Sequence, residues 1–241
     1  FNIDKDFFNR GKPYQKRRST KKSKLKYDLN FNFNKYSILN LKKSGLETKV
    51  KGNVIYKSSN REIIANIKSN FNGKGFLEFK FNTKLNKDFL KLELFSKGLD
   101  LESSEYRIGN RKVSFKKGDF KSNFKFKKSS TQTFCKGSFS FTDLKIKPAD
   151  FSENINSEIT RFYCKENNLI GNSDNLNYGT LNSNFNLNIP LNKSTNNIDL
   201  KGSVGYINSL NPDIKLSGNI PYWFDRRGIN FGNIDSSLKI N

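Results

Sequence analysis

The sequence predicts an all-β protein, built as an elongated and curled antiparallel or mixed β-sheet with an apolar inner face. Three observations predict this class. From Leu25 onward, apolar and polar residues alternate with a period of two through most of the chain, glycines recur on the apolar side of that pattern, and helical periodicity is almost absent. Aromatic residues make up 14% of the chain and include 23 Phe, a content that indicates a folded protein although only 34% of residues are hydrophobic.

The alternation of apolar and polar residues predicts strands one after another. It begins at 25–34 and recurs at 77–85, 90–94, 120–126, 181–189, 198–204 and 238–240. Since successive side chains of a strand point to opposite faces, one face should carry Phe, Leu and Ile and the other Lys, Asn, Ser and Glu. Short turns such as 72–75, 117–119 and 194–197 suit antiparallel hairpins, with roughly a dozen strands or more.

A short repeated pattern predicts that the sheet curls. Glycine stands between two apolar residues of the same face at 50–54, 135–139, 200–204 and 216–220. Glycines repeated along a sheet let it bend, and a bent sheet with one apolar face is a trough. A sandwich, in which a second sheet covers that face, stays open as an alternative.

The residues expected to line the inside of the trough are apolar and share the parity of their strands. They are Phe79, Phe81, Leu92, Leu94, Phe124, Phe126, Phe185, Leu187, Leu200, Val204, Leu216 and Ile220. The lysines at 80, 91, 125 and 201 have the opposite parity and should face solvent.

Composition divides the chain into four parts. Residues 1–24 form a basic lead, 25–162 a first sheet portion, 163–180 a polar, Asn-rich loop, and 181–241 a continuing sheet portion. The basic lead is either a solvated linker or a contact to phosphates or anionic headgroups. Because the chain begins at Phe1 and contains no Met, we expect it to be an internal piece of a longer protein.

Residues that carry catalysis are sparse. The chain has no His, which is the commonest general base, and lacks both the GxSxG and the GxxxxGK[ST] patterns. Acidic pairs such as Glu102 and Glu105 leave a two-carboxylate hydrolase open, but any sheet surface supplies such pairs. We therefore expect no catalytic residues, no cofactor and no metal site. Cys135 and Cys164 form either one disulfide in an oxidising compartment or two separate thiols.

The net charge of +22 indicates an anionic partner or simply a lysine-rich, soluble sheet surface. Nucleic-acid binding is one alternative, since Phe and Lys on a sheet can form a stacking platform. It is not the expected function, because the predicted strands place Phe and Lys on opposite faces. An outer-membrane β-barrel is a second alternative, weakened by strands of unequal length and apolar faces interrupted by Gly and Ser.

Two segments resemble the TamB family of translocation-and-assembly-module proteins, which are AsmA-like. The first is 99–115 followed by Gly118, Asp119 and Phe120, which resembles the strand-turn-strand repeats of that family. The second is 216–229, where Gly218 is followed by Ile220, Pro221 and Tyr222, as in cyanobacterial members and their plastid inner-envelope relatives. The resemblance extends over most of 46–241 and depends mainly on periodicity and glycine placement.

The resemblance implies a long parent protein anchored in the inner membrane, with a taco-shaped β-body in the periplasm or the intermembrane space of a plastid. It implies that the body passes phospholipid or apolar polypeptide along its hydrophobic groove and supports outer-membrane biogenesis and protein secretion. The implied partners are the apolar cargo and an Omp85-class outer-membrane barrel bound through other regions. The positive charge of the chain, independently of the resemblance, makes an anionic membrane surface a further candidate partner. The basic composition departs from typical bacterial members.

Overall fold

The computed structural model describes residues 26–41, 46–70, 74–85, 87, 89–103, 105–108, 111–130, 132–191, 196–206, 214–225, 228–233 and 235–240. The basic lead at 1–24 lies outside these residues. Every regular element in the described part is a β-strand, which confirms the predicted all-β class. No helix in this part has the length and hydropathy needed to cross a bilayer.

The described strands belong to a single sheet. They are β1 (Asp28–Leu41), β2 (Leu46–Lys57), β3 (Glu62–Asn70), β4 (Gly75–Lys84), β5 (Phe89–Asp100), β6 (Glu105–Ile108), β7 (Arg111–Lys128), β8 (Thr133–Pro148), β9 (Ile155–Lys165), β10 (Asn168–Tyr178), β11 (Leu181–Pro190), β12 (Asn196–Tyr206), β13 (Ile214–Asp225), β14 (Gly228–Phe231) and β15 (Asp235–Ile240).

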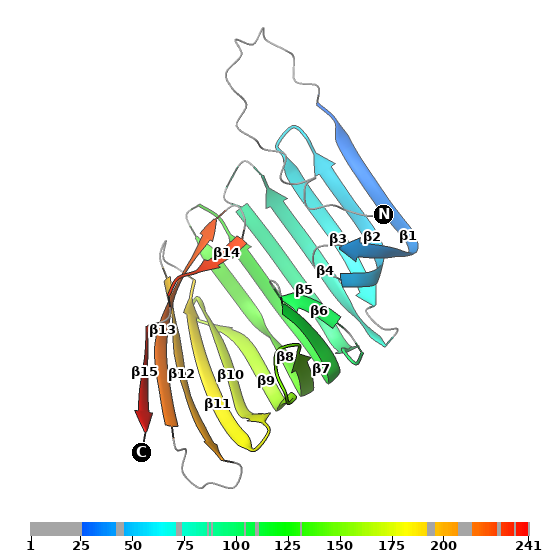
Figure 1. Ribbon diagram of the computed structural model, residues 1–241. Helices are drawn as coiled ribbons and strands as arrows, with labels where there is room; N and C mark the ends of the chain where they lie inside the picture. The colour runs from blue at the N-terminus through cyan, green and yellow to red at the C-terminus, as the bar shows by residue number, and fades with distance from the viewer. Residues whose placement is uncertain are drawn as a thin grey trace.

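The strands follow one another across the sheet almost in chain order, and all described pairings are antiparallel. The path runs from β1 to β5, continues directly to β7, and ends at β14, while β6 pairs with β7 and β15 pairs with β13. Figure 1 shows the result as one long sheet that twists and curls from β1 to β15 without a second layer stacked on it. The predicted elongated, curled sheet is therefore confirmed, with hairpins as its building unit.

Irregularities in the ladders accompany the curl. Register shifts interrupt the pairing between β4 and β5, between β5 and β7, between β7 and β8, and between β10 and β11. Bulges of this kind bend the strand that carries them and increase its twist. Two glycines of the repeated pattern, Gly52 and Gly137, have φ values of 139° and 89°, which side chains rarely tolerate.

The buried core lies in the middle of the sheet and has two parts. One contains Leu99, Leu101 and Phe120, where β5 meets β7. The other contains Phe124, Cys135 and Leu191, with partly buried neighbours on β5 and on the strands from β7 to β11. The core is thin for a chain of this size, because a single-layer sheet buries side chains only against neighbouring strands.

The prediction of a polar loop at 163–180 is wrong. This stretch forms the end of β9, a tight turn at 166–167, and β10, which pairs with both β9 and β11. Leu169, Gly171, Ser173 and Leu176 take the apolar side of β10. Gly and Ser at two of these positions weaken the apolar alternation, and pairing on both edges compensates for it.

Candidate functional site

The register of β4, β5 and β7 brings six of the predicted lining residues onto one face. Phe79 pairs with Leu94, which pairs with Phe124. The neighbouring row consists of Phe81, Leu92 and Phe126 in the same way. Directly opposed side chains on one face of a sheet lie close enough to pack, so these six form a continuous apolar area.

The other six predicted residues share a face on β11, β12 and β13. Leu187 pairs with Leu200, and Gly202 stands opposite both Phe185 and Leu216. Val204 and Ile220 have the same parity on β12 and β13 as Leu200 and Leu216.

Strands β8, β9 and β10 join the two groups into one surface. Phe139 pairs with Phe162, Phe162 with Gly171, and Gly171 with Leu187. The rings of Phe139 and Phe162 are stacked, with 4.8 Å between their centroids. All twelve predicted residues thus lie on one face of the sheet, which we name the apolar face. Eleven of the twelve are half-buried, and only Phe124 is buried.

The apolar face also holds residues that the predicted lining does not include. The patterns at 135–139 and 181–189 predict Phe139 and Ile189 on the apolar side, whereas Phe141, Phe162 and Leu169 were missed. The alternation of Ser138, Phe139, Ser140 and Phe141 was visible in the sequence and could have identified Phe141. Phe162 gave no such signal, because Thr160 and Cys164 flank it at the positions of the same parity.

The sheet curls toward the apolar face. Leu191 extends the β10–β11 ladder, with its amide donating to the carbonyl of Asn167 at 3.0 Å, and belongs to the same buried cluster as Cys135 and Phe124. Strands β8 and β11 are three positions apart, a separation of about 14 Å on a flat sheet. The shared cluster, which Cys164 and Leu169 fill from the strands between, indicates that the sheet bends toward the face that carries these side chains.

A second contact shows the same bend farther along. The hydroxyl of Tyr222 on β13 donates to the carbonyl oxygen of Pro190 on β11, across the intervening β12. Burial raises the pKa of Tyr222 to about 12. At the other end of the sheet, β6 lies against β2. Among the described strands, β2 and β6 are in substantial contact without being hydrogen-bonded to each other. All other strands in substantial contact are hydrogen-bonded neighbours, so within the described residues no second sheet covers the apolar face.

Hydroxyl groups interrupt the apolar face near its middle. The buried hydroxyls of Ser157 and Ser173 lie 2.9 Å apart, as do those of Ser157 and Thr160. Ser96 donates to the carbonyl oxygen of Phe76 at 2.7 Å. These hydroxyl groups find partners within the protein, as buried polar groups require, and they leave the surface offered to a ligand mainly apolar.

The opposite face, which we name the lysine face, carries most of the charge. Lys80 pairs with Glu93, Glu93 with Lys125, and Lys125 with Lys136. The hydrogen bond from Lys91 Nζ to Glu93 Oε1, at 2.8 Å, lowers the pKa of Glu93, and the nearby charges of Lys125 and Lys80 lower it further. The four lysines predicted to face solvent are exposed.

The expectation that rings and lysines occupy opposite faces fails at five positions of the described strands. Phe95, Phe134 and Tyr163 stand on the lysine face, opposite Asn123, Lys127 and Ser138 respectively. Phe76 and Phe89 stand there too, with Lys68 Nζ 3.6 Å from the centroid of the Phe76 ring and Phe89 opposite Lys84. Phe134 is 41% exposed and Tyr163 is 37% exposed. Phe134 and Tyr163 lie at irregular points of the alternation, next to Cys135, Phe162 and Cys164, where both faces carry apolar residues.

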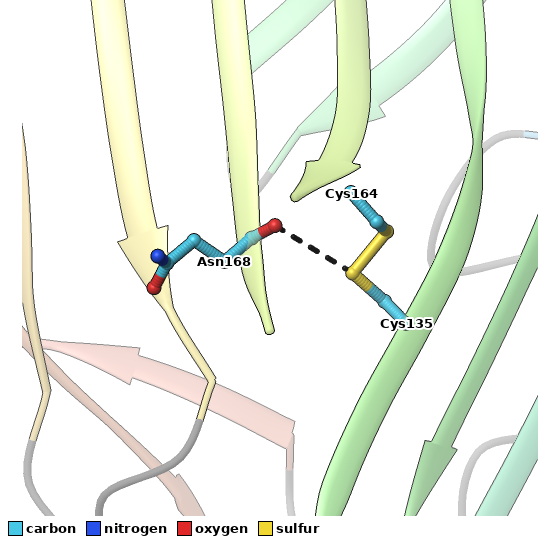
Figure 2. The surroundings of a disulfide bond; sticks show 3 residues. All are labelled: Cys135, Cys164 and Asn168. Carbon is cyan, nitrogen blue, oxygen red and sulfur yellow. Dashed lines mark hydrogen bonds between the residues drawn. A yellow bond between two sulfur atoms is a disulfide. The ribbon is translucent and has the colours of Figure 1, made fainter. Parts of the chain in front are cut away.

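Cys135 and Cys164 form a disulfide between β8 and β9 (Figure 2). Cys135 Sγ also lies 3.7 Å from the carbonyl oxygen of Asn168, at the start of β10. Of the two states that the sequence left open, a disulfide or two separate thiols, the structure has the disulfide. Within the described residues, no group of three or more His, Cys, Asp or Glu side chains is arranged to hold a metal ion.

Comparison with known proteins gives no relative. No family model matches the chain, and neither a curated protein nor a solved structure matches it.

Proposed function

We propose that this chain is a segment of an envelope-spanning bridge protein of the TamB kind, and that its apolar face holds the acyl chains of phospholipid in transit between the inner and outer membranes. The observation that carries the proposal is the apolar face itself. It runs across the hydrogen-bonded strands from β4 to β13, and eleven of its twelve predicted residues keep part of their surface exposed.

The energetics of exposed apolar surface support a ligand. Leaving apolar surface in water costs roughly 25 cal/mol per Å². Soluble proteins rarely expose apolar areas of this extent unless the area binds something. The apolar face offers rings and aliphatic side chains in repeated rows, such as Phe79–Leu94–Phe124, and a long hydrocarbon chain is the ligand that such repetition fits.

Transport on this face needs no chemical step. Successive rows present similar apolar side chains, so a hydrocarbon chain exchanges one set of contacts for a nearly equal one as it moves. The proposal therefore assigns no catalytic residue, no cofactor and no energy source to this segment.

The disulfide supports an envelope location. Structural disulfides form and persist in oxidising compartments, and the bacterial periplasm is one of them. An inner-membrane anchor and an Omp85-class partner would belong to regions outside this chain, and they are part of the proposal through the family resemblance only.

Site-specific photo-crosslinking tests the proposal. A photoreactive amino acid replaces Phe81 or Phe185 on the apolar face, and matched controls carry it at Lys80 or Asn186 on the lysine face. After illumination of the chain with phospholipid vesicles, mass spectrometry should find phospholipid adducts at Phe81 and Phe185 and few at the controls.

Two results would contradict the proposal. Equal labelling of both faces would indicate non-specific contact with vesicles. Crosslinks at Phe81 and Phe185 only to other residues of the same chain would indicate that the protein covers its own apolar face. Adducts with unfolded polypeptide in place of phospholipid would show that the apolar face binds a ligand, but that the ligand is polypeptide.

A further inference from the structure

The charged side chains are distributed unequally between the two ends of the strands. Successive hairpin turns alternate between these ends (Figure 1). The turns that join β2 to β3, β4 to β5, β7 to β8 and β9 to β10 share one end, which we name the basic end. The cations near it are Lys26, Lys57, Arg61, Lys84, Lys87, Lys91, Lys125, Lys127, Lys128, Lys136 and Lys165, and the acids are Asp28, Glu62, Glu93 and Glu166.

The opposite end has a different balance of charge. Its acids include Glu78, Asp100, Glu102, Glu105, Asp119, Asp143, Asp150, Glu153, Glu158 and Asp174, and its cations include Lys49, Lys51, Lys68, Lys74, Lys97, Lys116, Lys117, Lys145 and Lys147. Lysines there form ion pairs, with Nζ–Oε1 or Nζ–Oδ2 distances of 3.7 Å for Lys68–Glu78, 3.4 Å for Lys74–Asp100 and 3.4 Å for Lys117–Asp143. Positive charge is therefore largely compensated at this end and left in excess at the basic end.

Lysines at the basic end are placed directly opposite one another. Lys91 pairs in the ladder with Lys127, and Lys125 with Lys136. Like charges in directly opposed positions destabilise a sheet. Glu93, whose carboxylate lies 2.8 Å from Lys91 Nζ and stands opposite Lys125, offsets part of that repulsion. An anion bound beside Lys127 and Lys136 would relieve the rest.

Exposed apolar side chains lie among these lysines. Leu85, in the turn between β4 and β5, is 51% exposed, and Phe134, opposite Lys127, is 41% exposed. The Lys84 Nζ stands over the ring of Phe89, 5.3 Å from its centroid. Apolar tips surrounded by ammonium groups suit the interface of a bilayer, where side chains enter the headgroup region and lysines meet phosphates.

We infer that the basic end docks on the surface of an anionic phospholipid bilayer. Leu85 and Phe134 enter the headgroup region, and Lys84, Lys127 and Lys136 contact lipid phosphates. The role of docking rests on the proposed function. If the apolar face carries acyl chains, docking would place one end of that face at the bilayer surface from which the acyl chains enter.

The same lysines and rings suit single-stranded nucleic acid less well. Leu85 has no aromatic face on which a base could stack, whereas the exposed rings of Tyr27, Phe134 and Tyr163 do and belong to three different hairpins. The cations are spread over four neighbouring turns and do not follow one narrow channel. The disulfide also favours an oxidising compartment over one that contains nucleic acid.

Vesicle co-sedimentation tests docking. The chain is mixed with vesicles of phosphatidylcholine alone or of phosphatidylcholine with phosphatidylglycerol. We expect binding to the anionic vesicles that is about tenfold tighter and is weakened by added salt. The variant Lys127→Glu with Lys136→Glu should lose about tenfold in affinity for them, and Leu85→Ser with Phe134→Ser should also weaken binding.

A matched control separates docking from net charge. Lys116→Glu with Lys145→Glu makes the same change of charge at the opposite end, where both side chains are exposed. This control should bind anionic vesicles within about twofold of the unmodified chain if the basic end is the docking site. Circular dichroism and thermal unfolding establish that each variant remains folded.

Three outcomes would overturn the inference. They are equal losses in the two charge-reversal variants, no preference for anionic vesicles, or tighter binding of a single-stranded oligonucleotide that uses Lys127 and Lys136. Each leaves the crosslinking at Phe81 and Phe185 unaffected, so docking can fail while the proposed function stands. Conversely, loss of crosslinking with docking retained would contradict the proposed function alone.

Discussion

At Gly137, the partner strand comes so close that a side chain has no room. A Cβ there would lie 1.9 Å from the carbonyl oxygen of Asn123, and φ is 89°. Across the ladder stands Phe124, the only buried residue among the twelve predicted ones. Gly171 shows the same relation to an aromatic partner, since its Cβ would meet the ring of Phe162 at 2.6 Å. Glycine thus leaves space at positions where a large aromatic ring stands directly opposite on the neighbouring strand and the backbone bends.

Replacing this glycine should destabilise the sheet. We expect Gly137→Ala to lower the free energy of unfolding by about 1–3 kcal/mol, since the new Cβ meets backbone and the φ value disfavours side chains. Gly98→Ala is the control, because a Cβ there meets nothing within 4 Å. It should change stability by less than about 0.5 kcal/mol. Urea denaturation measures both variants, and equal stability of the two would contradict the structure at Gly137.

At the scale of the element, each strand depends on the partners at its two edges. β10 illustrates this dependence, because its Gly and Ser positions weaken the alternation that marks a strand, yet β9 and β11 pair with it along its length. Its start also lies beside the disulfide, where Asn168 contacts Cys135. The bridge and the two ladders together hold the stretch that composition alone assigned to a loop.

The disulfide should contribute measurably to the stability of the hairpin that β8 and β9 form. The two cysteines are 29 residues apart in sequence. Closing a loop of this length stabilises the folded state by about 3–4 kcal/mol in the chain-entropy model. We expect Cys135→Ser with Cys164→Ser to lower the thermal midpoint, and a reductant to lower that of the unmodified chain to the same value.

The double variant also serves as the control for the reductant. It has no remaining cysteine, so a reductant should leave its midpoint unchanged. Thiol titration of the unfolded, unreduced protein that finds two free thiols would show that the bridge is absent.

At the scale of the whole molecule, the sheet behaves as a one-dimensional array. With the exception of β6 against β2, described strands make their substantial contacts with hydrogen-bonded neighbours, and the buried clusters lie between β5 and β11. Every residue of β15 is exposed, including Leu238 at 67% and Ile240 at 76%. Stability in such arrays is a sum of local terms and varies along the chain.

Hydrogen exchange should therefore be graded along the sheet. We expect the strongest amide protection in β7 to β10 and the weakest in β1 and β15, with free energies of opening that differ by several kcal/mol. Mass spectrometry of peptides from the exchanged protein measures this profile. Uniform protection from β1 to β15 would instead show that the sheet unfolds as one cooperative unit.

The sequence by itself determined the strand class, the two unlike faces and the parity of all twelve predicted residues. It could do so because the side-chain period of a strand is two, so local order alone assigns each residue to a face. Which residues lie opposite one another, such as Leu187 and Leu200 or Phe81 and Leu92, became known only from the pairing of strands in the structure.

Only the tertiary structure decided what depends on distant segments. The curl toward the apolar face, the Cys135–Cys164 bridge, strand β10 and the gathering of lysines at one end all arise when hairpins stack in register. Local sequence does not contain these features, because the register and the bend of a sheet are set by contacts between residues far apart in the chain.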